Sequence, residues 1–191
     1  MSIRPFVAVA LLATLCSPVG LTGQSPTCQF RGAPDALLER PSPLDSVRVG
    51  LGGTDAKLCY GRPSAEGRAM IGGEHPFGAP WEMGANEPTT LHLPFPARVG
   101  SLDLSPGSYS LYAIPGASAW TVVVNGNPDR WGTPLSADVR ASDLGSFPVT
   151  PRSRDPFVET LTFSFRPADE RRGDLVYEWE GITLSIPVAR R

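Results

Sequence analysis

Proline and glycine interrupt this chain more often than a long helix tolerates. The 191 residues contain 20 glycines and 21 prolines, and proline reaches about double its average share. Between these residues, apolar and polar side chains alternate over short segments, which is the pattern of half-buried strands. The hydrophobic share of 41% is large enough to build a core. The pattern therefore excludes a helical bundle or coiled coil and indicates an all-β fold.

We predict about nine to ten short strands in one domain, residues 44–191, without an internal repeat. Short strands with regular turn signals indicate an antiparallel sandwich or barrel, and we expect a jelly-roll-like β-sandwich. The last two strands are expected to form a hairpin across Glu180-Gly181. One long loop without periodicity, residues 61–88, interrupts the domain, and such loops are often functional. The expected strands are 47–51, 56–60, 89–93, 97–99, 107–114, 119–124, 137–149, 157–165, 175–179 and 182–188.

The first 23 residues have the layout of a secretory signal peptide. Arg4 precedes an apolar run from Phe6 to Cys16, and small and turn-forming residues follow as far as Gly23. This run is too short to cross a bilayer core of about 30 Å. We expect cleavage after Gly23, export to the periplasm or beyond, and no transmembrane span in the mature chain. Acylation of Cys16 is an alternative, although Leu15 is unusual before a lipidated cysteine.

Export would leave two cysteines, Cys28 and Cys59, in an oxidising compartment. A disulfide between them is the expectation, and two unpaired thiols are the alternative. The bridge would attach an extended N-terminal lead-in, residues 24–43, to an early strand. The lead-in is expected to contain at most one helical turn, at 35–40. The chain has no Cys-x-x-Cys sequence, so neither a redox motif nor a zinc site is indicated.

Several motifs between Tyr60 and Trp131 follow one another in a specific order. They are Tyr60-Gly61-Arg62-Pro63-Ser64, Gly67-Arg68, Ile71-Gly72-Gly73, Pro76-Phe77-Gly78, Trp81, Gly84-Ala85-Asn86-Glu87, Pro106-Gly107-Ser108-Tyr109-Ser110-Leu111, Ile114-Pro115-Gly116, Trp120-Thr121-Val122, Asn125 and Trp131-Gly132. In these motifs the chain resembles DUF2911, an exported bacterial family of unknown function, over about residues 43–188. The resemblance implies a signal-bearing, β-rich exported domain with no established activity. One departure is Glu82, which stands where the family usually has arginine.

The candidate ligand site lies in the 61–88 loop. An aromatic ring offers a stacking face, and nearby Asn, Glu and Arg side chains orient a polar ligand through hydrogen bonds. A sugar, a peptide or a carboxylate would suit such a site, as would an envelope protein partner. The alternative is structural: the same polar groups tie the loop to the sandwich and Trp81 closes the core. The domain would then be a purely structural envelope module without a small ligand. The candidate residues are Arg62, Trp81, Asn86 and Glu87, with Tyr109 and Trp131 as possible neighbours.

Other functions have less support in the sequence. An envelope hydrolase would use Glu82 or Glu87, since paired carboxylates serve glycoside hydrolysis. His75 and His92 are the only histidines; their spacing does not indicate a metal site, and alternation predicts that His92 faces solvent. No cofactor is indicated.

Two further observations narrow the function classes. The net charge of −2 and the lack of a basic block argue against nucleic-acid binding, which depends on phosphate neutralisation. Trp120 and Trp179 lie within apolar strands and are expected in the core, where they would be unavailable to a ligand.

Overall fold

The computed structural model describes residues 26–191, so the predicted signal peptide 1–23 and Cys16 lie outside the described residues. Strands dominate the described part, as predicted. Two single-turn helices accompany them, and the first falls where the lead-in was expected to turn. The elements are α1 (Ala36–Glu39), β1 (Leu44–Leu51), β2 (Thr54–Gly61), β3 (Thr89–Leu93), β4 (Ala97–Val99), β5 (Leu102–Leu104), β6 (Gly107–Ile114), β7 (Trp120–Asn125), α2 (Ala137–Arg140), β8 (Asp143–Val149), β9 (Arg152–Pro167) and β10 (Arg172–Arg190).

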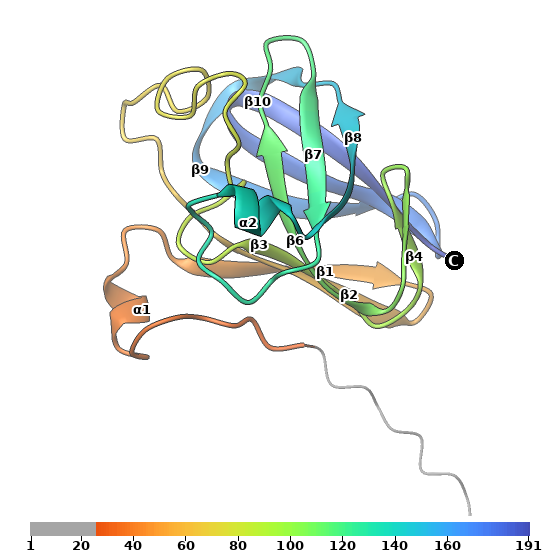
Figure 1. Ribbon diagram of the computed structural model, residues 1–191. Helices are drawn as coiled ribbons and strands as arrows, with labels where there is room; N and C mark the ends of the chain where they lie inside the picture. The colour runs from red at the N-terminus through yellow and green to blue at the C-terminus, as the bar shows by residue number, and fades with distance from the viewer. Residues whose placement is uncertain (1–25) are drawn as a thin grey trace, which may run out of the picture.

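Two antiparallel sheets form a sandwich, which confirms the predicted fold class (Figure 1). The larger sheet has six strands in the order β1-β2-β3-β6-β7-β8, and the smaller has four in the order β5-β4-β10-β9. Long β9 and β10 cross behind β6 and β7 in Figure 1. The inner faces of both sheets supply one apolar core, in which Trp120 and Trp179 are almost fully buried, as predicted.

The expected hairpin at Glu180-Gly181 is wrong, because β10 runs through both residues. Glu180 has a φ of 52°, and the register with β9 shifts on either side of it, so this position is a β-bulge. The Glu180 carboxylate accepts hydrogen bonds from the backbone N–H groups of Met70 and Ile71, each at 2.9 Å. The sequence Glu-Gly is compatible with either a hairpin turn or a β-bulge. Here the bulge forms, because it lets the Glu180 side chain bond to the 61–88 loop.

The strand predicted over 137–149 needs a smaller correction. Its first part forms α2, whose N-terminus is capped by the Ser136 hydroxyl accepting from the Val139 N–H. The strand itself, β8, begins only at Asp143.

The outer face of the six-stranded sheet is polar but covered. Cys59, Thr90, Ser110 and Asn125 occupy successive register positions on β2, β3, β6 and β7. Residues 26–43, here called the strap, run along one side of this face, and residues 126–142, here called the link, cross over β3 and β6 (Figure 1). Irregular chain therefore covers this face, whereas the second sheet covers the other.

Candidate functional site

A cavity of about 500 Å³ lies between the strap, the link and the outer face of the six-stranded sheet. Its wall mixes apolar groups with charged and hydroxyl side chains, which is typical of small-molecule sites, and its volume falls within their usual range. The lining residues are Pro26, Thr27, Gln29, Phe30 and Arg31 from the strap, Leu44, Cys59, Glu87, Pro88, Thr90, His92 and Ser108 from the sheet side, and Pro128, Asp129 and Arg130 from the link.

The strap is tied down over this cavity by one covalent bond and several ionic contacts. The predicted Cys28–Cys59 disulfide is present, with Cα atoms 5.6 Å apart. Buried Glu87 accepts from the Arg31 backbone N–H at 2.6 Å and from Arg40 Nη1 at 2.6 and 2.9 Å. The Arg31 side chain pairs with Asp129 of the link. These attachments make the strap a fixed roof over the cavity.

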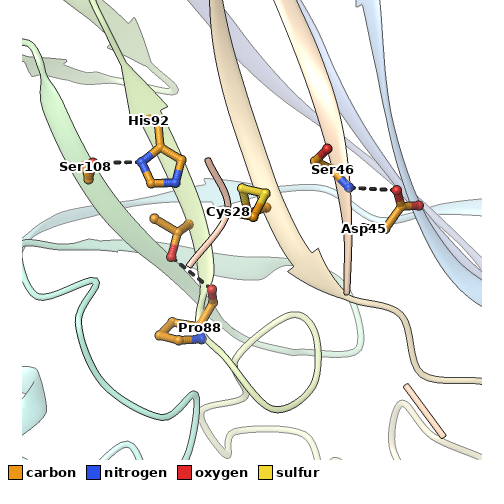
Figure 2. Close-up of a disulfide and its surroundings, with 8 residues drawn as sticks. Cys28, Asp45, Ser46, Pro88, His92 and Ser108 are labelled. Carbon is orange, nitrogen blue, oxygen red and sulfur yellow. Dashed lines mark hydrogen bonds between the residues drawn. A yellow bond between two sulfur atoms is a disulfide. The ribbon is translucent and has the colours of Figure 1, made fainter. Parts of the chain in front are cut away.

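His92 forms part of the cavity floor. We predicted that it faces solvent; it does point away from the core, but the strap covers it and leaves only 8% exposed. Its Nδ1 lies 2.7 Å from the Ser108 hydroxyl, and Figure 2 shows the ring between Ser108 and the Cys28 disulfide. Burial lowers the pKa of His92, and nearby Lys57 lowers it further. The ring is therefore neutral at pH 7, and its Nε2 has no hydrogen-bond partner among the described residues.

Arg130 forms the link side of the cavity. Its guanidinium donates to the carbonyl oxygens of Trp131 and Gly132 at 2.8 and 2.9 Å, and to the Ser110 hydroxyl at 3.1 Å. Its Nε is buried without a partner among the described residues, and burial lowers its pKa. This arginine is therefore held firmly by neutral acceptors and keeps an unused donor.

Glu82 lies behind Arg130, against the link. Burial raises its pKa to about 7, although nearby Arg130 opposes that rise. A Cβ on Gly132 would lie 1.3 Å from its Oε2, so only glycine allows this approach. That oxygen has no hydrogen-bond partner among residues 26–191. Glu82 does not line the cavity, but it places a titrating group next to the cavity's arginine.

Comparison with known proteins identifies the family. A family model described as a protein of unknown function, DUF2911, matches residues 42–188. The chain belongs to the DUF2911 family. No curated protein and no solved structure matches the chain. The matched range of the DUF2911 domain contains the cavity's floor and link, whereas Cys28 and most of the strap precede it.

Of the six candidate ligand residues, Glu87 lines the cavity and the other five do not. Trp81 is 3% exposed and stacks on His75 at 4.6 Å and on Trp179 at 5.5 Å between ring centroids. Its backbone exchanges two hydrogen bonds with Ala113. In the DUF2911 domain this ring therefore belongs to the core.

Arg62, Asn86 and Tyr109 bond to neighbouring chain. Arg62 donates to the Leu161 carbonyl and the Thr162 hydroxyl, both at 3.1 Å, which ties the loop to β9. Asn86 has a φ of 68°, and its side chain donates to the Ser42 carbonyl at 3.1 Å. The Tyr109 hydroxyl donates to the Ser105 carbonyl at 2.8 Å. Trp131 is 49% exposed, with the Arg40 guanidinium 6.0 Å from its ring centroid.

The residues that line the floor of the DUF2911 cavity were not among the candidates. Thr90, His92 and Ser108 come from two paired strands, and register places them on one face. One signal could have found them: a Cys28–Cys59 bridge puts the strap on the face that carries Cys59, and alternation puts polar side chains of neighbouring strands on that face. If the expected disulfide had been used to place the strap over this face, a buried His92 would have been predicted.

Within residues 26–191, no group of three or more His, Cys, Asp or Glu side chains is arranged to hold a metal ion. None of the helices in the described part of the chain has the length and apolar character needed to cross a membrane.

Proposed function

We propose that this DUF2911 domain is an exported binding protein that holds a small polar ligand in the cavity beneath the strap. The observation that carries the proposal is a cavity of about 500 Å³ beneath the disulfide-tethered strap, lined by charged, hydroxyl and imidazole side chains as well as apolar ones. A concave site with a few converging polar groups is the usual form of a small-molecule binding site.

Export is supported by the chemistry of the strap and by the N-terminal sequence. A structural disulfide persists in oxidising compartments and is rare in the cytosol, and Cys28–Cys59 is the covalent attachment of the roof. The signal-like first 23 residues agree with that compartment. The site is then assembled after the chain reaches an oxidising environment.

The cavity favours a small ligand over a protein partner at the 61–88 loop. In that loop Arg62 and Trp81 make contacts within the domain, so they offer few free groups to a partner. A hydrolase using Glu82 or Glu87 has less support. The Glu87 carboxylate already accepts three hydrogen bonds, and Glu82 does not line the cavity.

The test is a titration of the mature protein with small probes, in which the NMR signals of the backbone amides are monitored. The probes are galactose, N-acetylglucosamine, N-acetyl-L-alaninamide, N-acetyl-L-alanine and galacturonate, which cover neutral and acidic sugars and peptide fragments. We expect at least one to produce saturable shifts at the amides of Arg31, Thr90 and His92.

Two variants locate the binding. Ser108→Phe fills the cavity from its floor, and Ser146→Phe places the same ring on exposed β8 of the same sheet. Saturable shifts should disappear in the first variant and persist in the second. The proposal fails if no probe saturates those amides, or if binding survives Ser108→Phe unchanged.

A further inference from the structure

The charged side chains in the wall of the cavity balance one another. Within residues 26–191, the charged lining residues are two arginines and two acids, Arg31, Arg130, Glu87 and Asp129. Their formal charges sum to zero. Arg31 pairs with Asp129, and Glu87 pairs with Arg40 at 2.6 Å. A ligand with a net charge would therefore meet both attraction and repulsion from this wall, whereas a neutral ligand would meet neither.

The ionic groups also direct their hydrogen bonds to the protein itself. Glu87 accepts three hydrogen bonds from the strap. Arg130 donates to two carbonyl oxygens and to the Ser110 hydroxyl, and the buried Glu82 carboxyl lies beside it. Breaking one of these contacts would leave a buried group without its partner, which opposes binding. A ligand that bonds to the neutral side chains of the wall leaves these contacts intact.

The neutral part of the wall combines an aromatic ring with hydroxyl and amide groups. Phe30 of the strap lines the cavity and is 39% exposed. Thr27 and Gln29 of the strap and Ser108 of β6 line it as well, and all three are exposed. Their two hydroxyls and one carboxamide can each donate and accept hydrogen bonds. A matching ligand has an apolar face for the ring and hydroxyl groups around its edge.

The position of the cavity disfavours an extended peptide. The cavity floor lies on β2, β3 and β6, which are inner strands of the six-stranded sheet. A common way to bind an extended peptide is to add it as a strand to a free sheet edge. Each of these three strands is already paired on both sides. A compact ring that lies on the face of the sheet needs no such edge.

We propose that the ligand of this cavity is a neutral pyranose sugar, whose ring packs on Phe30 while its hydroxyl groups bond to the neutral side chains of the wall. The inference rests on the proposed binding function and names its ligand class. The C–H groups on one side of a pyranose form an apolar face, and an aromatic ring offers a large surface to cover it. The sugar hydroxyls match Thr27, Gln29 and Ser108, because groups on both sides donate and accept.

The experiment compares neutral sugars with their acids and with a neutral peptide fragment. Galactose is measured against galacturonate, N-acetylglucosamine against N-acetylglucosaminuronate, and both sugars against N-acetyl-L-alaninamide, by calorimetry at pH 7.5. The backbone amide signals of Arg31, Thr90 and His92 locate the binding. We expect the neutral sugar of at least one pair to bind three-fold or more tightly than its acid and than the peptide fragment. Lactose and diacetylchitobiose, which end in these two rings, distinguish the end of a glycan from a free sugar as the source.

Substitutions at Phe30 test the contact with the ring. Phe30→Leu keeps an apolar side chain but removes the aromatic face, and it should lower the affinity for the preferred sugar about ten-fold. Phe30→Trp should retain that affinity. Phe157→Leu makes the same change on β9, at a residue that is 57% exposed and does not line the cavity, and it should have no effect on binding.

The outcomes separate this inference from the proposed function. A neutral-to-acid affinity ratio below three in both pairs, or tighter binding of N-acetyl-L-alaninamide than of either sugar, would overturn the neutral-sugar inference and leave the proposed function standing. An affinity unchanged by Phe30→Leu would refute the role of Phe30. No saturable binding by any probe would overturn both proposals. The comparison of probes in the unmutated protein stands even if a Phe30 variant fails to fold.

Discussion

The two faces of the six-stranded sheet are built from alternate residues of the same strands, yet they are covered by different means. On the inner face, Leu58, Leu91 and Leu111 are fully buried against side chains of the second sheet. On the outer face, Cys59, Thr90 and Ser110 occupy the adjacent positions and lie beneath irregular chain. The alternation of the strands thus separates an apolar layer from a polar one.

The difference teaches where this fold is stabilised and where it has room for a ligand. Apolar burial contributes roughly 25 cal/mol per Å² without requiring direction, so the inner face can pack closely. The outer face depends on directional bonds and one covalent tether, and it retains a cavity. We infer that the inner face supplies most of the free energy of unfolding and that the outer face supplies the binding site.

The largest effect should come from a loop residue that contributes to the inner layer. Trp81→Ala removes a buried ring that stacks on both His75 and Trp179, and deleting a buried tryptophan costs about 3–5 kcal/mol. Urea denaturation measures the loss, and Trp81→Phe should recover part of it. A cost below about 1 kcal/mol would show that this ring does not belong to the core.

Removing the disulfide tests the tether of the outer face. Cys28→Ala with Cys59→Ala opens a loop with a sequence separation of 31, and such a bridge contributes about 3–4 kcal/mol by the chain-entropy argument. Urea denaturation gives the loss, while limited proteolysis should cut within the strap before the core unfolds. Methyl NMR signals of Leu111 and Val122 should remain in place.

Adding a reducing agent to both proteins serves as the control for this double substitution. It should destabilise the unmodified protein and leave the double variant unchanged. Equal protection of the strap in both proteins would mean that the ionic contacts of Glu87 hold the roof without the bridge.

A pH series tests Glu82, which is buried against the link. Its pKa is raised to about 7 in the folded state by burial and is near 4.5 when unfolded, so the folded protein binds more protons between these values. Ionisation therefore opposes folding: stability falls as pH rises from about 4.5 to 7 and stays lower above it. Glu82→Gln should unfold much like the original at pH 5 and be more stable by up to about 3 kcal/mol at pH 8.

The two histidines His75 and His92 also titrate, and burial lowers their pKa values, so their contribution to stability rises with pH. This contribution is present in both proteins, and the difference between the two stabilities therefore isolates Glu82. A difference that does not change between pH 5 and pH 8 would show that Glu82 titrates normally.

The fold could be predicted because its signals are local. Alternation in β1, where Val47, Val49 and Leu51 recur at every second position, separates inner from outer residues without knowledge of their partners, and the compartment predicts the disulfide. The bulge at Glu180 could not be predicted, since the backbone N–H groups that select it come from Met70 and Ile71, more than a hundred residues earlier.

The candidate site residues were grouped by their nearness along the chain, and the structure distributes them over separate regions. In the 61–88 loop, Arg62 bonds to the backbone of β9 and Trp81 is buried in the core. Glu87, near the end of the loop, lies beneath the strap. Its motif residues therefore serve three different regions. Residues that share the cavity, such as His92 and Arg130, are brought together by register and by the link, and neither is visible in local sequence.

The smallest effect should come from Trp131, the tryptophan that no layer buries. Its ring is 49% exposed, and the Arg40 guanidinium lies 6.0 Å from the ring centroid. Such a cation–π contact is worth about 0.5–1 kcal/mol at an exposed site. Trp131→Ala should therefore cost less than about 1 kcal/mol in urea and change the affinity for N-acetylglucosamine by less than about two-fold, since the ring does not line the cavity. A ten-fold loss of affinity with unchanged stability would instead extend the binding site beyond the strap, to the exposed end of the link. The ligand would then have to be larger than the cavity holds, and the roof would have to open around it.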